Sequence, residues 1–164
     1  MQVDYIDLTI PKTKSIALIA HDNKKQALID WCLEHAEILK EHALCGTGTT
    51  ALLITKMTGM TVKGYNSGPL GGDQQIGAKI VEGRINLVVF FCDPLSAQPH
   101  DPDVRALLRI AQLYDIPIAT NRSTADFLIS SALMSDSYVH TVQNFHQSIV
   151  QRIDSFQEQE ENES

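Results

Sequence analysis

The sequence has 164 residues, 43% hydrophobic and 20% charged, which is typical of one globular domain with a sizeable core and leaves no apolar run long enough to span a membrane. Four of its seven net negative charges come from glutamates in the last seven residues, so the remaining chain carries only three. This charge argues against a nucleic-acid surface, and Asp4 and Asp7 interrupt the N-terminal apolar stretch too early for a signal peptide.

Short apolar runs alternate with helix-like segments along the chain. Five runs have the pattern of buried strands, and they cover residues 15–20, 43–45, 62–65, 86–92 and 116–119. Helical periodicity or capping residues predict helices over 23–38, 49–57, 72–82, 103–114, 124–129 and 143–156. Strands that alternate with helices indicate an α/β fold with a mostly parallel sheet.

We therefore expect a single α/β domain over residues 1–156, with a doubly wound, mostly parallel five-stranded sheet flanked by helices. Residues 157–164 contain no apolar side chain and are expected to form an acidic, disordered tail. Cys32, Cys45 and Cys92 are odd in number and widely spaced, which favours a reducing cytoplasmic location over disulfides or a structural zinc site.

All nine glycines lie between Gly46 and Gly83, where they frame two polar loops over 45–50 and 67–75. Glycine permits sharp turns and a close approach of the backbone to a ligand. Further polar residues follow the other three predicted strands, beginning at His21, Asp93 and Thr120. In an open parallel sheet these loops meet in one crevice, which is where ligands bind.

The first loop, with Thr47, Gly48, Thr49 and Thr50, precedes a predicted helix whose free N–H groups attract anions. Lys25 or Lys24 could add a full positive charge. A plain turn with threonine caps is the alternative. A dinucleotide fingerprint is disfavoured because no acidic residue ends the next strand, and a P-loop is excluded because Gly-Lys-Ser/Thr is missing.

Three groups of residues could supply acid–base chemistry. Asp73 begins a helix, where it is either a cap or a base that the helix terminus keeps ionised. His100 lies in a proline-bounded polar loop, where an imidazole can polarise a carbonyl or carry protons. His21 with Asp22 is a second candidate pair, although both also suit caps and polar contacts. Asp93 could orient an imidazole or form a turn, and no histidine spacing predicts a metal site.

These loops together resemble the methylglyoxal synthase family from about Ile16 to Ile129. The resemblance rests on five stretches, namely IALIAHD (16–22), TGTT (47–50), SGPLGGDQQ (67–75), DPL (93–95) and PHDPDVRALLR (99–109). It implies conversion of dihydroxyacetone phosphate to methylglyoxal and inorganic phosphate, without metal or organic cofactor, in a homohexamer that phosphate inhibits.

The resemblance also implies a role for each matched residue. Asp73 would be the catalytic base, His100 would polarise the carbonyl and shuttle protons, and His21 would bind substrate. The phosphate would be held by Lys25, Thr47, Gly48, Thr49, Thr50, Ser67 and Gly68. A supporting acidic shell would comprise Asp22, Asp93, Asp101 and Asp103. Arg152 is the candidate for reaching a neighbouring subunit, although residues 131–151 match the family poorly.

Two other functions fit the same loops. The fold resembles regulatory modules of larger biosynthetic enzymes, which bind phosphorylated effectors and need neither base nor proton donor. An aldose–ketose isomerase acting on a triose phosphate is the second alternative. The presence of Asp73, His21 and His100 together favours the lyase.

Overall fold

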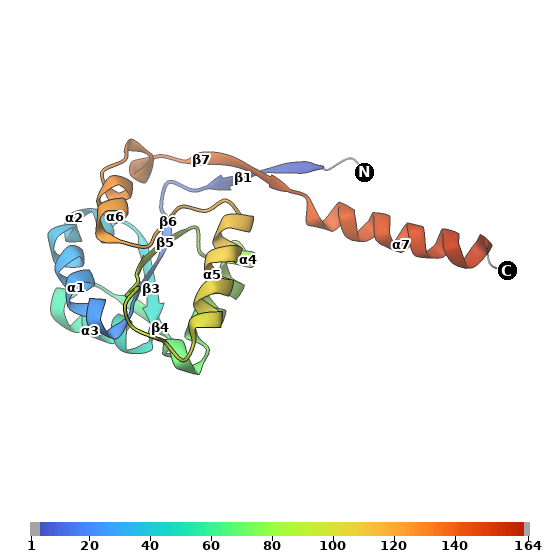
Figure 1. Cartoon of the computed structure of the whole chain (residues 1–164). Coiled ribbons are helices and arrows are strands. Elements are labelled where there is room, and N and C mark those ends of the chain that lie inside the picture. The colour runs from blue at the N-terminus through green and yellow to red at the C-terminus, as the bar shows by residue number, and fades with distance from the viewer. Residues whose placement is uncertain (1–3, 163–164) are drawn as a thin grey trace.

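The computed structural model describes residues 4–162, and its centre is a five-stranded parallel sheet (Figure 1). The strands are β2 (Ser15–Ala20), β3 (Ala43–Thr47), β4 (Val62–Tyr65), β5 (Leu87–Phe91) and β6 (Ile118–Ala119). Their register is parallel at each of the four pairings. The predicted α/β class with a parallel five-stranded sheet is therefore confirmed.

The strand order is β4-β3-β2-β5-β6, so the first strand of this sheet, β2, lies at its centre and later strands are added on both sides. From β2 it passes to β3 and β4 on one side, and then returns to β5 and β6 on the other. Connections that leave neighbouring strands in opposite directions open a crevice at the carboxyl ends of those strands. The loops after β2, β3, β4 and β5 surround this crevice.

Helices cover both faces of the sheet (Figure 1). One face is covered by α1 (Lys25–Glu34), α2 (Ala36–Leu39), α3 (Gly48–Thr58) and α6 (Arg122–Ile129). The opposite face is covered by α4 (Gly72–Val81) and α5 (Asp101–Leu113). Short 3-10 turns span Asp22–Lys24, Gly68–Leu70 and Ala132–Ser135.

Alternation along the strands divides the core in two. In β2, Ile16 and Leu18 pack toward α1 and α3, whereas Ala17 and Ile19 pack toward α4 and α5. Both faces are buried, which explains why these strands are continuous apolar runs. Trp31, which is 1% exposed, is the largest side chain of the first cluster, and its indole N–H donates to Asp126 Oδ1 at 2.9 Å.

A two-stranded antiparallel ribbon, absent from the expectations, joins the two ends of the described chain. It consists of β1 (Tyr5–Ile10) and β7 (Tyr138–Gln143), and it leads into α7 (Phe145–Asn162), which projects away from the body (Figure 1). The expected terminal helix over 143–156 therefore begins two residues later and extends further.

Residues 157–162, where a disordered tail was expected, continue α7 in the structure. Glutamate and glutamine are good helix formers, which agrees with a helical backbone over this polar segment. The division expected at residue 156 therefore falls within a helix. Glu163 and Ser164 lie outside the described residues. No helix in the described part of the chain is both long and apolar enough to cross a membrane.

Candidate active site

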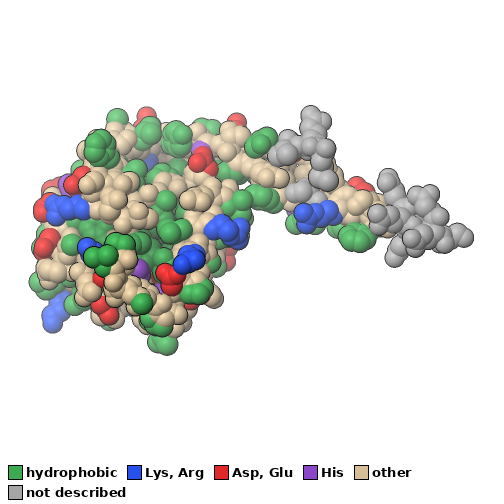
Figure 2. Space-filling model, in the orientation of Figure 1, with side chains coloured by type: hydrophobic (Ala, Val, Ile, Leu, Met, Phe, Trp, Pro, Cys, Tyr) green, Lys and Arg blue, Asp and Glu red, His purple; other side chains and the backbone are tan. Residues whose placement is uncertain are grey.

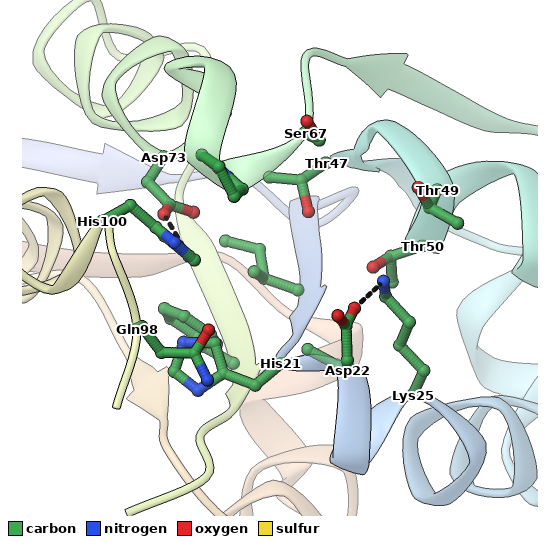
Figure 3. A pocket seen from close by; sticks show the side chains of 15 residues that line it. His21, Asp22, Lys25, Thr47, Thr49, Thr50, Ser67, Asp73, Gln98 and His100 are labelled. Carbon is green, nitrogen blue, oxygen red and sulfur yellow. Dashed lines mark hydrogen bonds and ion pairs between the residues drawn. The ribbon is translucent and has the colours of Figure 1, made fainter. Parts of the chain in front are cut away.

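A cavity of about 240 Å³ lies in the crevice at the carboxyl ends of β2, β3 and β5. Its walls come from the loop after β2, the start of α3, the second glycine loop, and the loop before α5 (Figure 3). The residues that line it are Ile19, Ala20, His21, Asp22, Lys25, Thr47, Thr49, Thr50, Ser67, Gly68, Pro69, Asp73, Phe90, Gln98 and His100. Nine of the residues expected to be catalytic or to bind substrate therefore meet here, namely His21, Lys25, Thr47, Thr49, Thr50, Ser67, Gly68, Asp73 and His100.

Asp73 and His100 face each other across one side of the cavity (Figure 3). The distance from Asp73 Oδ2 to His100 Nε2 is 3.6 Å, which is longer than a hydrogen bond. Asp73 lies in the first turn of α4, but the cap position belongs to Gly71 and no side chain caps the helix. The capping alternative for Asp73 therefore fails.

Burial shifts the pKa of Asp73 in the direction opposite to the expectation. The side chain is 1% exposed, and its Oδ2 atom has no hydrogen-bond partner. Desolvation raises the pKa of Asp73, and the opposing attraction of His100 is weaker. The expected effect of the helix terminus was a carboxylate held ionised, but loss of water outweighs it. A raised pKa makes Asp73 a stronger base once it is ionised.

His21 is held in one tautomer by the backbone. Its Nδ1 atom accepts a hydrogen bond from the N–H of Asp93 at 2.9 Å, so the neutral ring carries its proton on Nε2. Desolvation, and then the proximity of His100, lower the pKa of His21, which favours this neutral form. The rings of His21 and His100 lie 5.8 Å apart, edge to face. His21 Nε2 is buried without a partner and is available to donate to a ligand.

The start of α3 forms another side of the cavity. Thr47 precedes the helix with an extended backbone, and its side chain caps no backbone N–H. The hydroxyl groups of Thr47 and Thr50 are thus placed in the cavity wall, and both residues are buried. Free N–H groups and the partial positive charge of a helix N-terminus favour an anion there.

Lys25 brings a positive charge to the same side. Its ammonium group pairs with the carboxylate of Asp22, and it points toward Thr50 in Figure 3. This hydrogen bond from Lys25 is the main reason why the pKa of Asp22 is lowered. Asp22 is exposed, so the ion pair lies at the cavity mouth, where an entering anion can compete for the ammonium group.

Two glycines allow the backbones of the two polar loops to approach each other closely. A Cβ atom on Gly48 would lie 3.0 Å from the backbone nitrogen of Ser67, and one on Gly72 would lie 2.0 Å from the carbonyl oxygen of Asn66. The Gly48 N–H also donates to this same carbonyl at 3.1 Å. Gly48 thus links the first loop to the second through this backbone hydrogen bond, although it does not line the cavity itself.

Three expected members of the acidic shell lie outside the cavity lining. The Asp93 carboxylate accepts from Asn23 Nδ2 and from the Leu95 N–H, Asp101 pairs with Arg105, and Asp103 accepts from Gln74 Nε2. Asp101 and Asp103 also fail to cap α5, which has no side-chain cap. Asp93 reaches the site through its backbone N–H, and Asp22 is the member that lines the cavity.

The position of Arg152 also follows from the structure. It is exposed on α7, the helix that projects from the body, and it does not line the cavity.

Gln98 and Phe90 line the cavity without having been expected there. Gln98 stands two residues before His100, which is the sequence signal that could have found it.

Among residues 4–162, no group of three or more His, Cys, Asp and Glu side chains is arranged to hold a metal ion. The same residues contain four buried side-chain atoms without a hydrogen-bond partner, and three of these belong to His21, Asp73 and His100. Buried polar atoms are rarely left unpaired, so their concentration in one cavity points to a polar ligand.

Comparisons with known proteins agree with this geometry. The family described as MGS-like domain matches residues 27–120. Methylglyoxal synthase from Clostridium acetobutylicum is 59% identical over 143 residues, covering 87% of this chain and 97% of that protein. The enzyme from Pectobacterium atrosepticum is 51% identical over 151 residues, covering 92% and 99% respectively.

The crystal structure of methylglyoxal synthase from Elizabethkingia anophelis NUHP1 superposes with a TM-score of 0.83 at 44% identity, covering 88% of this chain and 95% of that one. Sequence identities of 44% to 59% over nearly whole chains show a shared family as well as a shared fold. The chain is an enzyme that belongs to the methylglyoxal synthase family.

Proposed function

We propose that this protein is a carbon–oxygen lyase that converts dihydroxyacetone phosphate to methylglyoxal and inorganic phosphate. The observation that carries the proposal is the cavity in which a helix N-terminus, the buried carboxylate of Asp73 and the imidazoles of His21 and His100 face the same space. A triose monoester has the matching groups, namely a phosphate at one end and a ketone with an acidic C–H at the other.

The phosphate is assigned to Lys25, the α3 terminus with Gly48, and the hydroxyls and backbone of the two loops. These loop residues are Thr47, Thr49, Thr50, Ser67 and Gly68. They combine a full charge, neutral donors and a helix dipole, which together suit a dianionic ester. Asp73 and His100 lie on the other side of the cavity and would therefore face the carbon atoms.

Asp73 removes a proton from the hydroxymethyl carbon, and the bonding electrons move into a carbon–carbon double bond while negative charge develops on the ketone oxygen. Donation from the Nε2–H of His21 and from the imidazole of His100 stabilises this charge. Both rings are already in place, so no reorganisation is needed as the charge forms. Desolvation of Asp73 favours the transfer because burial raises its pKa.

The enediolate then expels phosphate. Its electrons form the C1 aldehyde and a new double bond to C3, the carbon–oxygen bond to phosphate breaks, and the C1 hydroxyl proton is released. Protonation of C3 completes methylglyoxal, and His100 is assigned this proton transfer. Expulsion requires the breaking bond to stand out of the enediolate plane, and we assign this torsion to the grip of both loops on the phosphate.

Three further features belong to the proposal. Free phosphate would inhibit by occupying the same cradle as the ester phosphate. A homohexamer is supported by the projecting ribbon and α7, where Tyr5, Ile149, Ile153 and Phe156 are exposed. Arg152 on that helix would then act on a neighbouring copy. A cytoplasmic location is supported by the three free cysteines.

Lysine and arginine side chains are scattered among acidic ones on the face in Figure 2, with no basic patch for nucleic acid.

The test of the proposal is product analysis. Purified protein is incubated with dihydroxyacetone phosphate and followed by ³¹P and ¹H NMR. Methylglyoxal and inorganic phosphate should appear in equal amounts. Glyceraldehyde 3-phosphate would indicate the isomerase, and binding without turnover would indicate the regulatory module.

A further inference from the structure

Gln98 places an unused carboxamide in the cavity. Its side chain is half-buried and lines the same cavity as His21 and His100 (Figure 3). Within residues 4–162, no hydrogen bond is formed by its amide oxygen or nitrogen, in contrast to Gln74 and Gln75, whose side chains are both engaged. A carboxamide offers both a donor and an acceptor, so Gln98 is free to bind a hydroxyl group.

The backbone holds Gln98 in a fixed relation to His100. The carbonyl oxygen of Gln98 accepts from the N–H of Asp101 at 3.2 Å, which closes a turn with Pro99 and His100 as its central residues. Proline fixes its own φ angle, and the carbonyl of His100 then accepts from Asp103 as α5 begins. The amide and the imidazole therefore come from one rigid turn.

The chemistry at this end of the cavity leaves one substrate group without a partner. Dihydroxyacetone phosphate carries two oxygens besides its phosphate, the ketone oxygen and the C1 hydroxyl. The Nε2–H of His21 is a donor and suits the ketone oxygen, and Asp73 must remain free to take the C1 proton. A neutral acceptor for the C1 hydroxyl is still needed, and a carboxamide supplies one without competing as a base.

Resting on the proposed function, we infer that Gln98 binds the C1 hydroxyl of the substrate and selects hydroxymethyl ketone phosphates over analogues without that hydroxyl. The amide oxygen accepts from the hydroxyl, and the amide N–H can donate to the same oxygen as the enediolate forms. Gln98 is thus a specificity-determining residue in the same turn as His100.

The test compares two ligands that differ only in this hydroxyl. Dissociation constants for dihydroxyacetone phosphate and acetol phosphate are measured by calorimetry in the Asp73→Asn background, where turnover does not interfere, with and without Gln98→Leu. Leucine keeps the size of the side chain and removes its hydrogen bonds. Ser96→Ala, in the same loop but outside the cavity lining, is the matched control.

Gln98→Leu should weaken dihydroxyacetone phosphate about 2- to 10-fold, as for one neutral hydrogen bond, and leave acetol phosphate and inorganic phosphate within twofold. An equal loss for all three ligands, or no loss for any, overturns the inference. Failure of the wild type to release phosphate would defeat the proposed function instead, because the binding comparison does not depend on turnover.

Discussion

Replacing Gly68 by alanine should remove activity while leaving the fold intact. A Cβ atom at this position would lie 2.7 Å from His100 Nε2 and 3.2 Å from Asp73 Oδ2. Both contacts are with the ends of side chains, so the imidazole can turn away and the backbone need not move. Gly68 does not have a positive φ angle, so alanine fits its backbone conformation.

The size of the effect follows from these distances. Ordinary van der Waals contact begins at 3.4 Å, so the His100 ring must retreat by roughly 0.7 Å. A displacement of about 1 Å in a catalytic group can cost about 100-fold in rate. We therefore expect kcat to fall about 30- to 100-fold, equivalent to about 2–3 kcal/mol of transition-state stabilisation.

The assay measures kcat by phosphate release and Tm by thermal unfolding. Gly77→Ala is the matched control, because a Cβ atom there meets nothing within 4 Å in the helix that carries Asp73. It should keep full activity and gain about 0.5–1 kcal/mol of stability. Gly72→Ala should instead destabilise the fold, since its Cβ atom would meet a backbone oxygen at 2.0 Å. If Gly68→Ala kept more than a third of wild-type kcat, the assigned geometry would be refuted.

Three other substitutions or titrations test separate parts of the structure. Because burial raises the pKa of Asp73, ionisation of this carboxyl opposes folding at pH values above the ordinary aspartate pKa. Asp73→Asn should therefore raise Tm at neutral pH, and equal Tm values for the two proteins would contradict the raised pKa. The difference should vanish near pH 3, where the carboxyl is protonated in both states. Because burial lowers the pKa of His21, its NMR titration should have a midpoint below 6.5, and the stability that depends on the neutral ring should be lost as pH falls through this range. A midpoint above 6.5 would contradict the lowered pKa. Lys14 is 3% exposed and donates to the carbonyls of Pro11, Lys12 and Asp136, so Lys14→Met should cost about 2–3 kcal/mol in urea unfolding, whereas the exposed Lys12→Met should cost less than about 0.5 kcal/mol.

Buried strands are the part of the fold that sequence predicts best. The runs that form β2 and β5 are apolar at every position because helices cover both faces, and this pattern is visible locally. The ribbon of β1 and β7 was missed because its residues are mostly exposed and no local pattern links strands more than 120 positions apart. The continuation of α7 to Asn162 could not be predicted from hydrophobic periodicity, because residues 157–162 are all polar.

The site could be predicted in outline from the carboxyl-end loops, but its electrostatics could not. The raised pKa of Asp73 depends on burial by segments from several elements. The local partners of Asp93, Asp101 and Asp103 were equally invisible, because a carboxylate in a loop has the same sequence signature whether it faces a cavity or a neighbouring amide. Gln98 belongs to no chemical motif and was found only from its place in the cavity wall.

The role of Asp73 is tested most directly by comparing phosphate release from dihydroxyacetone phosphate by the wild type and by Asp73→Asn, with phosphate binding measured on both proteins. Loss of the positioned base should lower kcat by at least about 10²–10⁴-fold and leave the dissociation constant for inorganic phosphate within about threefold. Substantial turnover by Asp73→Asn would contradict the account, because the proton would then leave carbon without the carboxylate that the cavity places beside it.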